Sequence, residues 1–238
     1  MKKSLTIVGA AMLVYGQAGA EELTEKSLWK ASAELGYVST SGNTSTETLN
    51  TKAAISTDRE NWKHKAELTA LKSSDSVTTT AEKYTFFAQS DYKLSKPNFL
   101  FGNVNYENDK FSGFEYQVTE TIGYGRRVVD NESVTLDLEI GPGSRQVKLD
   151  SGKKTSEGIL RGAAKLDWNV SSTSKFSEVL TVEAGEDASI TKSVTSLSSK
   201  INGSLSMKIT YTYKLTSEVP VGVDDTDTET AVTLVYNF

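Results

Sequence analysis

The 238-residue sequence contains no cysteine and only one histidine, His64. A transition-metal site is therefore not expected, because thiolates and imidazoles are its usual ligands. Catalytic motifs are missing as well, since the sequence has no G-x-S-x-G and no H-E-x-x-H segment. The single histidine also argues against a histidine-dependent hydrolase. We expect a protein that is not an enzyme, with no catalytic residues and no cofactor.

Long hydrophobic runs are absent too. Beyond the first twenty residues, no segment approaches the roughly 18 consecutive apolar residues of a membrane-spanning helix. Hydrophobic residues make up 37% of the chain and the mean hydropathy is −0.37, which is too polar for a bundle of such helices. A transmembrane β-barrel suits these values, because only every second residue of each strand faces lipid. The formal net charge of −5, without a basic stripe, gives no reason to expect nucleic-acid binding.

The N-terminus has the features of a secretory signal peptide. Lys2 and Lys3 precede an apolar run at residues 5–15, and an Ala-Gly-Ala cleavage signal follows at residues 18–20. An uncleaved membrane anchor is the alternative, but the apolar run is too short to cross about 30 Å of hydrocarbon as a helix. The predicted parts are a cleaved signal peptide, a short periplasmic segment and an outer-membrane barrel, at residues 1–20, 21–28 and 29–238.

Apolar and polar residues alternate along most of the remaining chain. Between residues 205 and 215, Leu, Met, Ile and Tyr alternate with Ser, Thr and Lys, and Val232, Leu234, Tyr236 and Phe238 share one face of the last segment. This period of two is typical of strands with one apolar face. It predicts an all-β fold, a transmembrane antiparallel up-and-down β-barrel of about twelve strands. The predicted strands are residues 29–39, 46–57, 62–72, 81–94, 99–109, 116–129, 133–143, 158–170, 174–184, 192–202, 205–217 and 228–238.

The connections between these strands are predicted to alternate in length. Short connections are expected at residues 58–61, 95–98, 130–132, 171–173 and 202–204. Longer connections are expected at residues 73–80, 110–115, 144–157, 185–191 and 218–227, and the connection at 40–45 is only slightly longer than the short set. Outer-membrane barrels have short periplasmic turns and longer external loops, so an even number of strands places both termini in the periplasm.

Aromatic residues are predicted to form two girdles on the apolar face, where the headgroups of a membrane would lie. Core aromatics of a soluble sandwich are the alternative, but a sandwich would not bring all three tryptophans to one end. Glu120 falls on the apolar face and is an exception. The periplasmic girdle would contain Trp29, Trp62, Trp168, Phe176, Tyr92, Tyr236 and Phe238, and the external girdle Tyr37, Tyr84, Tyr106 and Tyr116. His64 would lie on the same face, near the periplasmic side.

Several short motifs resemble a known family. They are Gly36-Tyr37 followed by Ser41-Gly42-Asn43-Thr44, Asp109-Lys110-Phe111-Ser112-Gly113-Phe114 with Tyr116, Gly123-Tyr124-Gly125, Gly141-Pro142-Gly143 with Arg145, Thr226-Asp227-Thr228-Glu229-Thr230, and Tyr236-Asn237-Phe238. With these motifs the chain resembles the salt-induced outer-membrane proteins, a bacterial family whose domain has no assigned function. The resemblance covers nearly the whole predicted mature chain. It implies an outer-membrane barrel and a link to salt or osmotic response, but no mechanism.

The inner face of the predicted barrel carries charges of both signs. With strands about 4.8 Å apart and tilted by about 40°, twelve strands give a backbone radius of roughly 12 Å. Long side chains would occupy much of that space, so two interpretations remain open. One is a narrow porin-like channel with charge-dependent selectivity, and the other is a structural barrel blocked by salt bridges. The candidate pore-lining residues are Lys52, Lys65, Glu67, Asp91, Lys93, Glu107, Asp137, Glu139, Arg161, Lys165, Asp167, Lys208 and Lys214.

The ends of the strands carry three further candidate features. Phe238, with Tyr236 on the same face, is predicted to be the C-terminal signal that the barrel-assembly machinery reads. Asp224, Asp225 and Asp227 are weak candidates for a divalent metal site, with a solvated acidic loop as the simpler interpretation. Gly141-Pro142-Gly143 is expected to end its strand and to open a basic loop, with Arg145, Lys148, Lys153 and Lys154. This loop could contact lipopolysaccharide, and surface solvation explains its charge equally well.

The sequence thus predicts an integral protein of the bacterial outer membrane, exported by a cleavable signal peptide. Its function is predicted to be a narrow channel for ions or small solutes. A structural barrel for envelope integrity is the alternative, and a lipid-modifying outer-membrane enzyme is a remote one. The expected partners are outer-membrane lipid and lipopolysaccharide, the barrel-assembly machinery and periplasmic chaperones.

Overall fold

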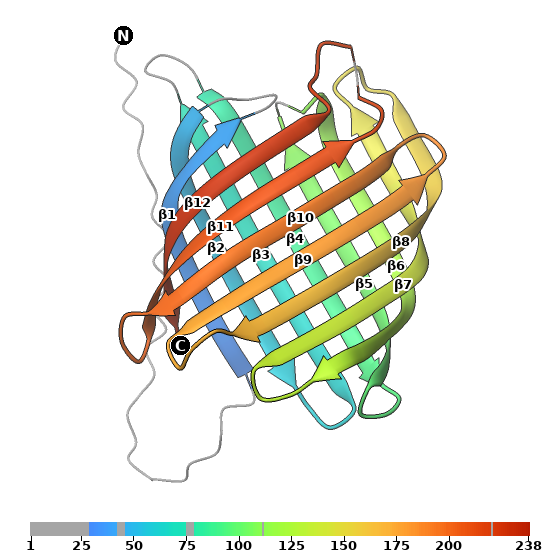
Figure 1. Ribbon diagram of the computed structural model, residues 1–238. Coiled ribbons are helices and arrows are strands. Elements are labelled where there is room, and N and C mark those ends of the chain that lie inside the picture. Colours follow the sequence, from blue (N-terminus) through green and yellow to red (C-terminus); the bar gives the residue numbers. More distant parts are fainter. Residues whose placement is uncertain (1–28, 42–45, 75–78, 111, 220) are drawn as a thin grey trace, which may run out of the picture.

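Twelve antiparallel strands close into a barrel in the computed structural model, as the sequence predicts (Figure 1). The structure describes residues 29–41, 46–74, 79–110, 112–219 and 221–238, so the predicted signal peptide and the segment 21–28 lie outside it. No helix in this described part is long and apolar enough to cross a membrane. The strands are β1 (Trp29–Ser41), β2 (Thr46–Asp58), β3 (Trp62–Ser74), β4 (Thr79–Lys93), β5 (Asn98–Asp109), β6 (Phe114–Asp130), β7 (Val134–Leu149), β8 (Lys154–Asn169), β9 (Ser174–Gly185), β10 (Ser189–Lys200), β11 (Leu205–Thr216) and β12 (Thr226–Asn237).

The alternation in the sequence decides which side chains face inward. In β12, Thr233 and Val235 are buried, whereas Val232 and Leu234 are 42% and 51% exposed on the outer face. Each strand pairs with its neighbours in the chain, and the ring closes where β1 pairs with β12. Because the ring is closed, the sheet has no edge with unpaired backbone N–H and C=O groups. A sheet can cross the hydrocarbon of a membrane only under this condition.

The predicted difference between short turns and long loops is small in the structure. Most strands extend past their predicted ends on the side of the predicted loops, and most connections at both ends of the barrel contain only three or four residues. We call the two ends the turn end, which carries the connections 59–61, 94–97, 131–133, 170–173 and 201–204, and the loop end, which carries 42–45, 75–78, 110–113, 150–153, 186–188 and 217–225. Only the last of these connections is long. The orientation of the termini therefore stays a prediction.

The largest error concerns the predicted loop 144–157, which is paired strand except at residues 150–153. Pro142 does not end β7, because the register with β8 continues through Pro142–Leu160 to Lys148–Lys154. On the side of β6, the paired residues jump from Thr121–Gly143 to Tyr124–Ile140, and Pro142 lies in this gap. A proline has no N–H to donate, so a strand accepts it where one ladder is interrupted.

Two places in the ring bring neighbouring backbones so close that only glycine fits. A Cβ atom on Gly123 of β6 would lie 2.3 Å from the Ile140 carbonyl oxygen of β7. A Cβ atom on Gly36 of β1 would lie 2.4 Å from the Val232 carbonyl oxygen of β12. The β6–β7 and β12–β1 contacts are six strands apart around the ring. We interpret them as the two sharp bends of a flattened barrel.

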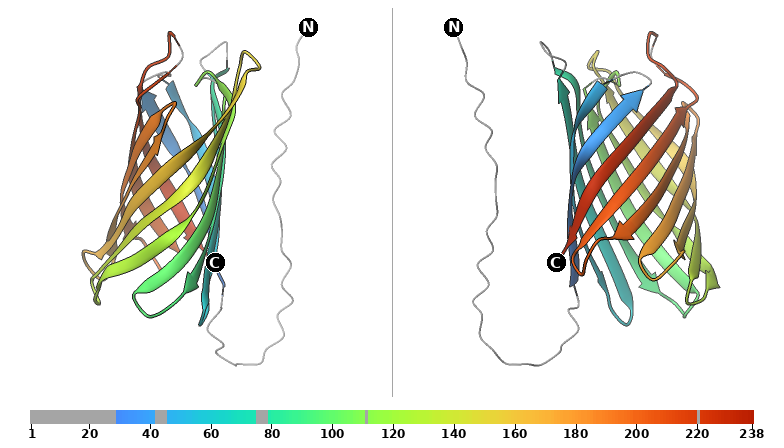
Figure 2. Two further views of the ribbon diagram at one scale, coloured as in Figure 1. Left: turned by 90° about the vertical axis from the view of Figure 1, so that its right-hand side faces the viewer. Right: turned by 60° about the vertical axis from the view of Figure 1, so that its left-hand side comes forward.

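A contact across the interior supports this shape. Lys214 Nζ of β11 lies 2.8 Å from Glu107 Oε1 of β5, although these strands are six positions apart in the ring. A round barrel would have a diameter of roughly 24 Å, whereas extended lysine and glutamate side chains together reach roughly 14 Å. The two walls must therefore approach each other at this level. The barrel is accordingly narrower in the left view of Figure 2 than in Figure 1.

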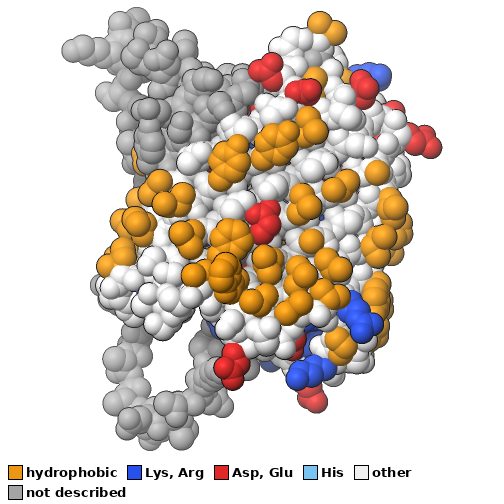
Figure 3. Space-filling model, viewed as in Figure 1, with side chains coloured by type: hydrophobic (Ala, Val, Ile, Leu, Met, Phe, Trp, Pro, Cys, Tyr) orange, Lys and Arg blue, Asp and Glu red, His pale blue; other side chains and the backbone are white. Residues whose placement is uncertain are grey.

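Many hydrophobic side chains lie on the face of the barrel that Figure 3 shows. Aromatic contacts lie towards both ends of the outer face. At the turn end, the ring centroid of Trp62 lies 5.0 Å from that of Tyr92, Trp168 lies 6.4 Å from Phe176, and Trp29 is 48% exposed. At the loop end, Tyr106 lies 6.3 Å from Tyr116, and Tyr84 is exposed; the side chain of Tyr37 lies outside the described residues. His64 stacks on Trp62 and its Nδ1 is 2.8 Å from Ser90 Oγ. Glu120 is exposed between buried Thr119 and Thr121, so the predicted exception is confirmed.

Candidate functional site: the charged lumen

Glu139 of β7 is the centre of a cluster in the lumen, on the turn-end side of the middle of its strand. Its side chain is 1% exposed and accepts hydrogen bonds from Arg161 Nη1 at 3.1 Å and Lys165 Nζ at 2.5 Å, both on β8. Gln89 Nε2 of β4 donates to the same carboxylate at 3.0 Å. Lys165 Nζ also donates to Gln89 Oε1 at 3.0 Å, which joins two strands four positions apart. A buried carboxylate is stable only with such complete pairing.

The same cluster has an aromatic and an acidic side. The Arg161 guanidinium carbon lies 5.8 Å from the ring centroid of Phe101, which is only 4% exposed. Asp91 Oδ1 accepts a hydrogen bond of 2.7 Å from Gln89 Nε2. Asp137 and Lys165 are opposite each other in register, but the Asp137 carboxylate binds Arg127 at 2.7 and 2.9 Å. Charged and polar side chains therefore fill this part of the lumen from several strands.

A second cluster lies nearer the loop end. The Glu107 carboxylate contacts Lys214 Nζ at 2.8 Å across the lumen and Lys83 Nζ at 3.5 Å on the adjacent strand. Lys83 Nζ also lies 3.8 Å from Asp109. The side chains of Glu107 and Lys214 are 10% and 14% exposed, so this contact is almost enclosed. It joins two strands that are six positions apart, the largest separation that a ring of twelve strands allows.

The wall formed by β1, β2, β3 and β11 is lined by a third set of pairs. Glu67 lies between Lys52 Nζ at 2.9 Å and Lys65 Nζ at 3.0 Å. Lys208 Nζ donates to Glu34 at 2.6 Å. These contacts join neighbouring or next-neighbouring strands, so they lie along the wall and do not bridge the lumen.

Two of the predicted pore-lining residues lie at the rim of the turn end. Lys93 Nζ donates to Asp58 and to the Arg59 carbonyl oxygen, next to the 59–61 turn. Asp167 pairs with Lys175 at 3.0 Å, and both side chains are about half exposed. Water screens such exposed pairs, so they contribute little to stability.

Sequence reasoning missed Arg145 as an interior residue, because the predicted strand stopped before it. Arg145 is 2% exposed and lies 3.2 Å from Glu157 and 3.7 Å from Glu183, and its Nη1 donates to the Ala188 carbonyl oxygen at 3.0 Å. Arg145, the first cation of the expected basic loop, thus lies in β7 and points into the barrel interior. Lys83 could have been found, because the alternation around Tyr84 already places it on the inner face.

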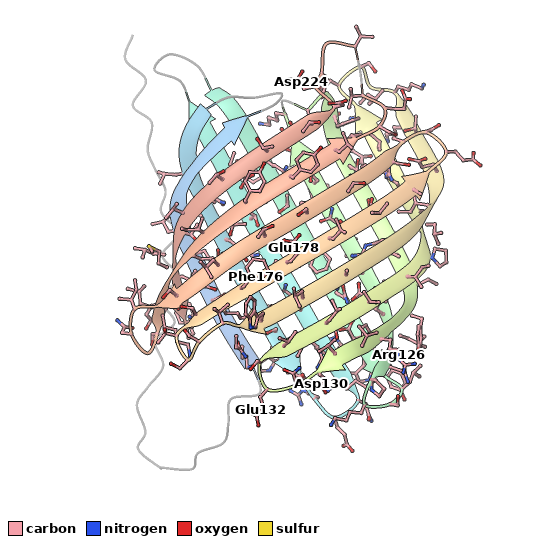
Figure 4. All side chains as sticks on the ribbon, in the orientation of Figure 1. Arg126, Asp130, Glu132, Phe176, Glu178 and Asp224 are labelled. Carbon is pink, nitrogen blue, oxygen red and sulfur yellow. The ribbon has the colours of Figure 1, made fainter. Side chains whose placement is uncertain are left out.

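The acidic loop and the C-terminus lie away from the lumen clusters. Asp224, labelled at the loop end in Figure 4, and Asp225 are exposed, and Thr226 Oγ1 donates to Asp225 at 2.9 Å. Among the described residues, no group of three or more His, Asp or Glu side chains could hold a metal ion, Asp227 included. Phe238 is 79% exposed, its ring lies 4.8 Å from Tyr236, and its N–H donates to Ala31 of β1 at 3.0 Å. The last residue thus lies on the seam that closes the barrel.

The model of the family described as "Protein of unknown function, DUF481" matches residues 33–238. The chain belongs to this family. The resemblance drawn from the sequence motifs is thereby confirmed. Another protein similar to this DUF481 chain is the uncharacterized protein YdiY of Escherichia coli (strain K12). It is 24% identical over 213 residues, which are 89% of this chain and 84% of YdiY.

Solved structures resemble this DUF481 barrel in fold. The NanC porin is 11% identical, covers 86% of this chain with 98% of its own length, and has a TM-score of 0.59. The translocator domain of the autotransporter NalP from Neisseria meningitidis is 14% identical, with 88% of each chain covered and a TM-score of 0.51. The KdgM porin is 13% identical, covers 87% of this chain with 99% of its own, and has a TM-score of 0.50. At these identities the likeness shows the fold.

Proposed function

We propose that the protein is an integral outer-membrane barrel that passes small ions or solutes through a narrow, charged lumen. The observation that carries this proposal is the division of the barrel wall into an apolar outer face and a charged inner face. Such a wall is stable with hydrocarbon outside and water inside. The porins among the similar folds support the proposal, and the expected link to salt or osmotic stress stays a prediction.

On this proposal, the Glu107–Lys214 and Glu139–Lys165 contacts form the constriction of the channel. Fixed charges of both signs in a narrow passage would hold ions weakly and select them by charge and size. The other predicted lining residues would form the walls on either side, except Lys93 and Asp167, which lie at the rim of the turn end. No chemistry is required of them, in keeping with the expectation that the protein is not an enzyme.

Single-channel conductance in a planar bilayer tests this function. The refolded protein should give discrete conductance steps in KCl, and Lys214→Ala should give larger steps because it removes the contact between opposite walls. Lys175→Ala is the matched control, since it removes a lysine from an exposed pair at the rim. Steps of equal size in the protein and both variants would place the constriction elsewhere.

A structural barrel with a sealed lumen is the second candidate, and the same contact between opposite walls favours it. In that case both the natural protein and Lys214→Ala would be silent, although each shows the heat-dependent gel migration of a folded barrel. The protein would then act through its loops and its place in the envelope. Silence of the two folded forms would contradict the channel.

The proposed route to the membrane follows from the two ends of the chain. Residues 1–20 would direct export, and periplasmic chaperones would carry the chain to the barrel-assembly machinery, which would read Phe238 and Tyr236. The loop end would then meet lipopolysaccharide. Recovery of the protein in the soluble periplasmic fraction would contradict this placement.

A further inference from the structure

An acidic residue, Glu178 of β9, lies in the middle of the apolar outer face. In Figure 3 one acidic side chain stands among hydrophobic side chains on this face, at the place where Figure 4 labels Glu178. On the same strand, Leu180 and Val182 share its face and are 41% and 42% exposed. Phe176 lies on the same face towards the turn end. Apolar residues therefore surround Glu178 along its own strand.

Hydroxyl groups of the next strand hold this carboxylate. Ser193 Oγ of β10 donates to Glu178 Oε1 at 2.6 Å, and Thr195 Oγ1 donates to Oε2. An ionised carboxylate has about four acceptor sites. Two of them remain after these bonds. Lipid chains offer no donor for these sites, and an unsatisfied polar group in hydrocarbon costs several kcal/mol.

The polarity is not confined to one residue. The strand registers place Glu178 beside Thr195, Thr195 beside Tyr211 of β11, and Tyr211 beside Thr230 of β12. These four outer-face residues form one row across four strands, which we call the polar row. Leu197 and Ile209, each exposed, follow on the side of the turn end. On the side of the loop end, Leu180, Ser193, Tyr213 and Thr228 follow in register, so the flank of the row is apolar only towards the turn end. This polarity differs from the uniform apolar surface that lipid requires.

We infer that the polar row is the contact surface for a second copy of this barrel. This inference rests on the membrane placement in the proposed function, but not on conduction. A two-fold axis along the membrane normal places the same surface of both copies face to face, so the surface must be self-complementary. The polar row meets this condition, because Glu178 of one copy can accept a hydrogen bond from the Tyr211 hydroxyl of the other. The flanking Leu197 and Ile209 side chains would pack around these bonds.

Glu120 of β6 provides a matched comparison on another part of the outer face. Its register neighbours are Val104 and Ser144, so it lacks a row of hydroxyl donors. It lies in a depression of about 660 Å³ that Gly102 and Ser144 help to line. We therefore assign the contact surface to Glu178 and use the surroundings of Glu120 as the control.

The absence of cysteine from the chain allows a clean cross-linking test. Leu180→Cys places a thiol beside the polar row, and Ile122→Cys places one beside Glu120. In lipid vesicles, a short bis-maleimide should link Leu180→Cys into a dimer and leave Ile122→Cys monomeric. Adding Glu178→Leu to Leu180→Cys should lower the dimerisation constant about three- to twentyfold, the range that polar contacts contribute inside membranes. Adding Glu120→Leu should leave it unchanged.

Each other outcome overturns the inference. Equal cross-linking of both thiols would indicate random collisions, and a monomer in every case would exclude the contact. An undiminished dimer with Glu178→Leu would remove Glu178 from it. Heat-dependent gel migration shows that each variant is folded. A conducting monomer would contradict only the contact, whereas a silent dimer would contradict only the channel.

Discussion

At the scale of single residues, Glu139 has the most demanding environment. Its carboxylate is almost inaccessible to solvent, and three side chains from two other strands stabilise its negative charge. Its inward direction could be predicted from the alternation in β7, because Leu138 and Ile140 point outward. Its partners could be predicted only in part: Arg161 and Lys165 lie on the adjacent strand, but Gln89 is a neutral residue fifty positions earlier in the chain.

Replacement of Glu139 by leucine should be strongly destabilising. It leaves Arg161 and Lys165 together without their shared counter-charge, and breaking a buried pair in this way costs about 3–5 kcal/mol. Asp167→Leu is the control, because its pair with Lys175 is exposed and should contribute about 1 kcal/mol or less. The measurement is the free energy of unfolding in urea, with the barrel refolded into vesicles. Similar losses for the two variants would show that the Glu139 cluster does not stabilise the barrel.

At the scale of strands, the sequence predicts all twelve elements and their order, because each inner face alternates with an apolar outer face. It fails at the ends of β7 and β8, where Gly141-Pro142-Gly143 looks like a stop signal. The structure shows why: Pro142 disturbs the ladder towards β6 alone, and the pairing with β8 continues to Lys148. The position of a proline in the sequence does not show which of the two neighbouring strand ladders it interrupts.

Glycine substitutions test the proposed bend between β6 and β7. Gly123→Ala should lower the free energy of unfolding by about 1–3 kcal/mol, as overpacking does, because the new methyl group would meet the Ile140 carbonyl oxygen. Gly162→Ala is the control, since a Cβ atom there meets nothing within 4 Å. It should be neutral or stabilising by up to about 1 kcal/mol, because alanine is less flexible than glycine in the unfolded chain. Urea unfolding measures both, and equal effects would contradict the tight bend.

At the scale of the whole molecule, the flattened shape could not be predicted from the sequence. Alternation assigns each side chain to the lumen or to the outside, but it does not say which opposite walls approach. Lys214 and Glu107 are 107 positions apart, and their contact depends on ring closure, strand tilt and the two glycine bends together. Alternation therefore predicts which charged side chains face inward, whereas it does not predict the contact between Lys214 and Glu107.

The salt dependence of conductance tests whether the contact between Lys214 and Glu107 limits the flow of ions through the lumen. The double variant Lys214→Ala, Glu107→Ala keeps the net charge, so both proteins should concentrate ions in the lumen to a similar degree. The Debye length falls from about 10 Å at 0.1 M to about 3 Å at 1 M salt, but salt screens an almost enclosed pair such as Glu107–Lys214 much less than it screens exposed charges. The natural protein should therefore conduct less than the double variant by a similar factor at 0.1 M and at 1 M KCl. A natural protein that approaches the double variant at 1 M KCl would mean that salt reaches the ion pair and loosens the contact between the walls.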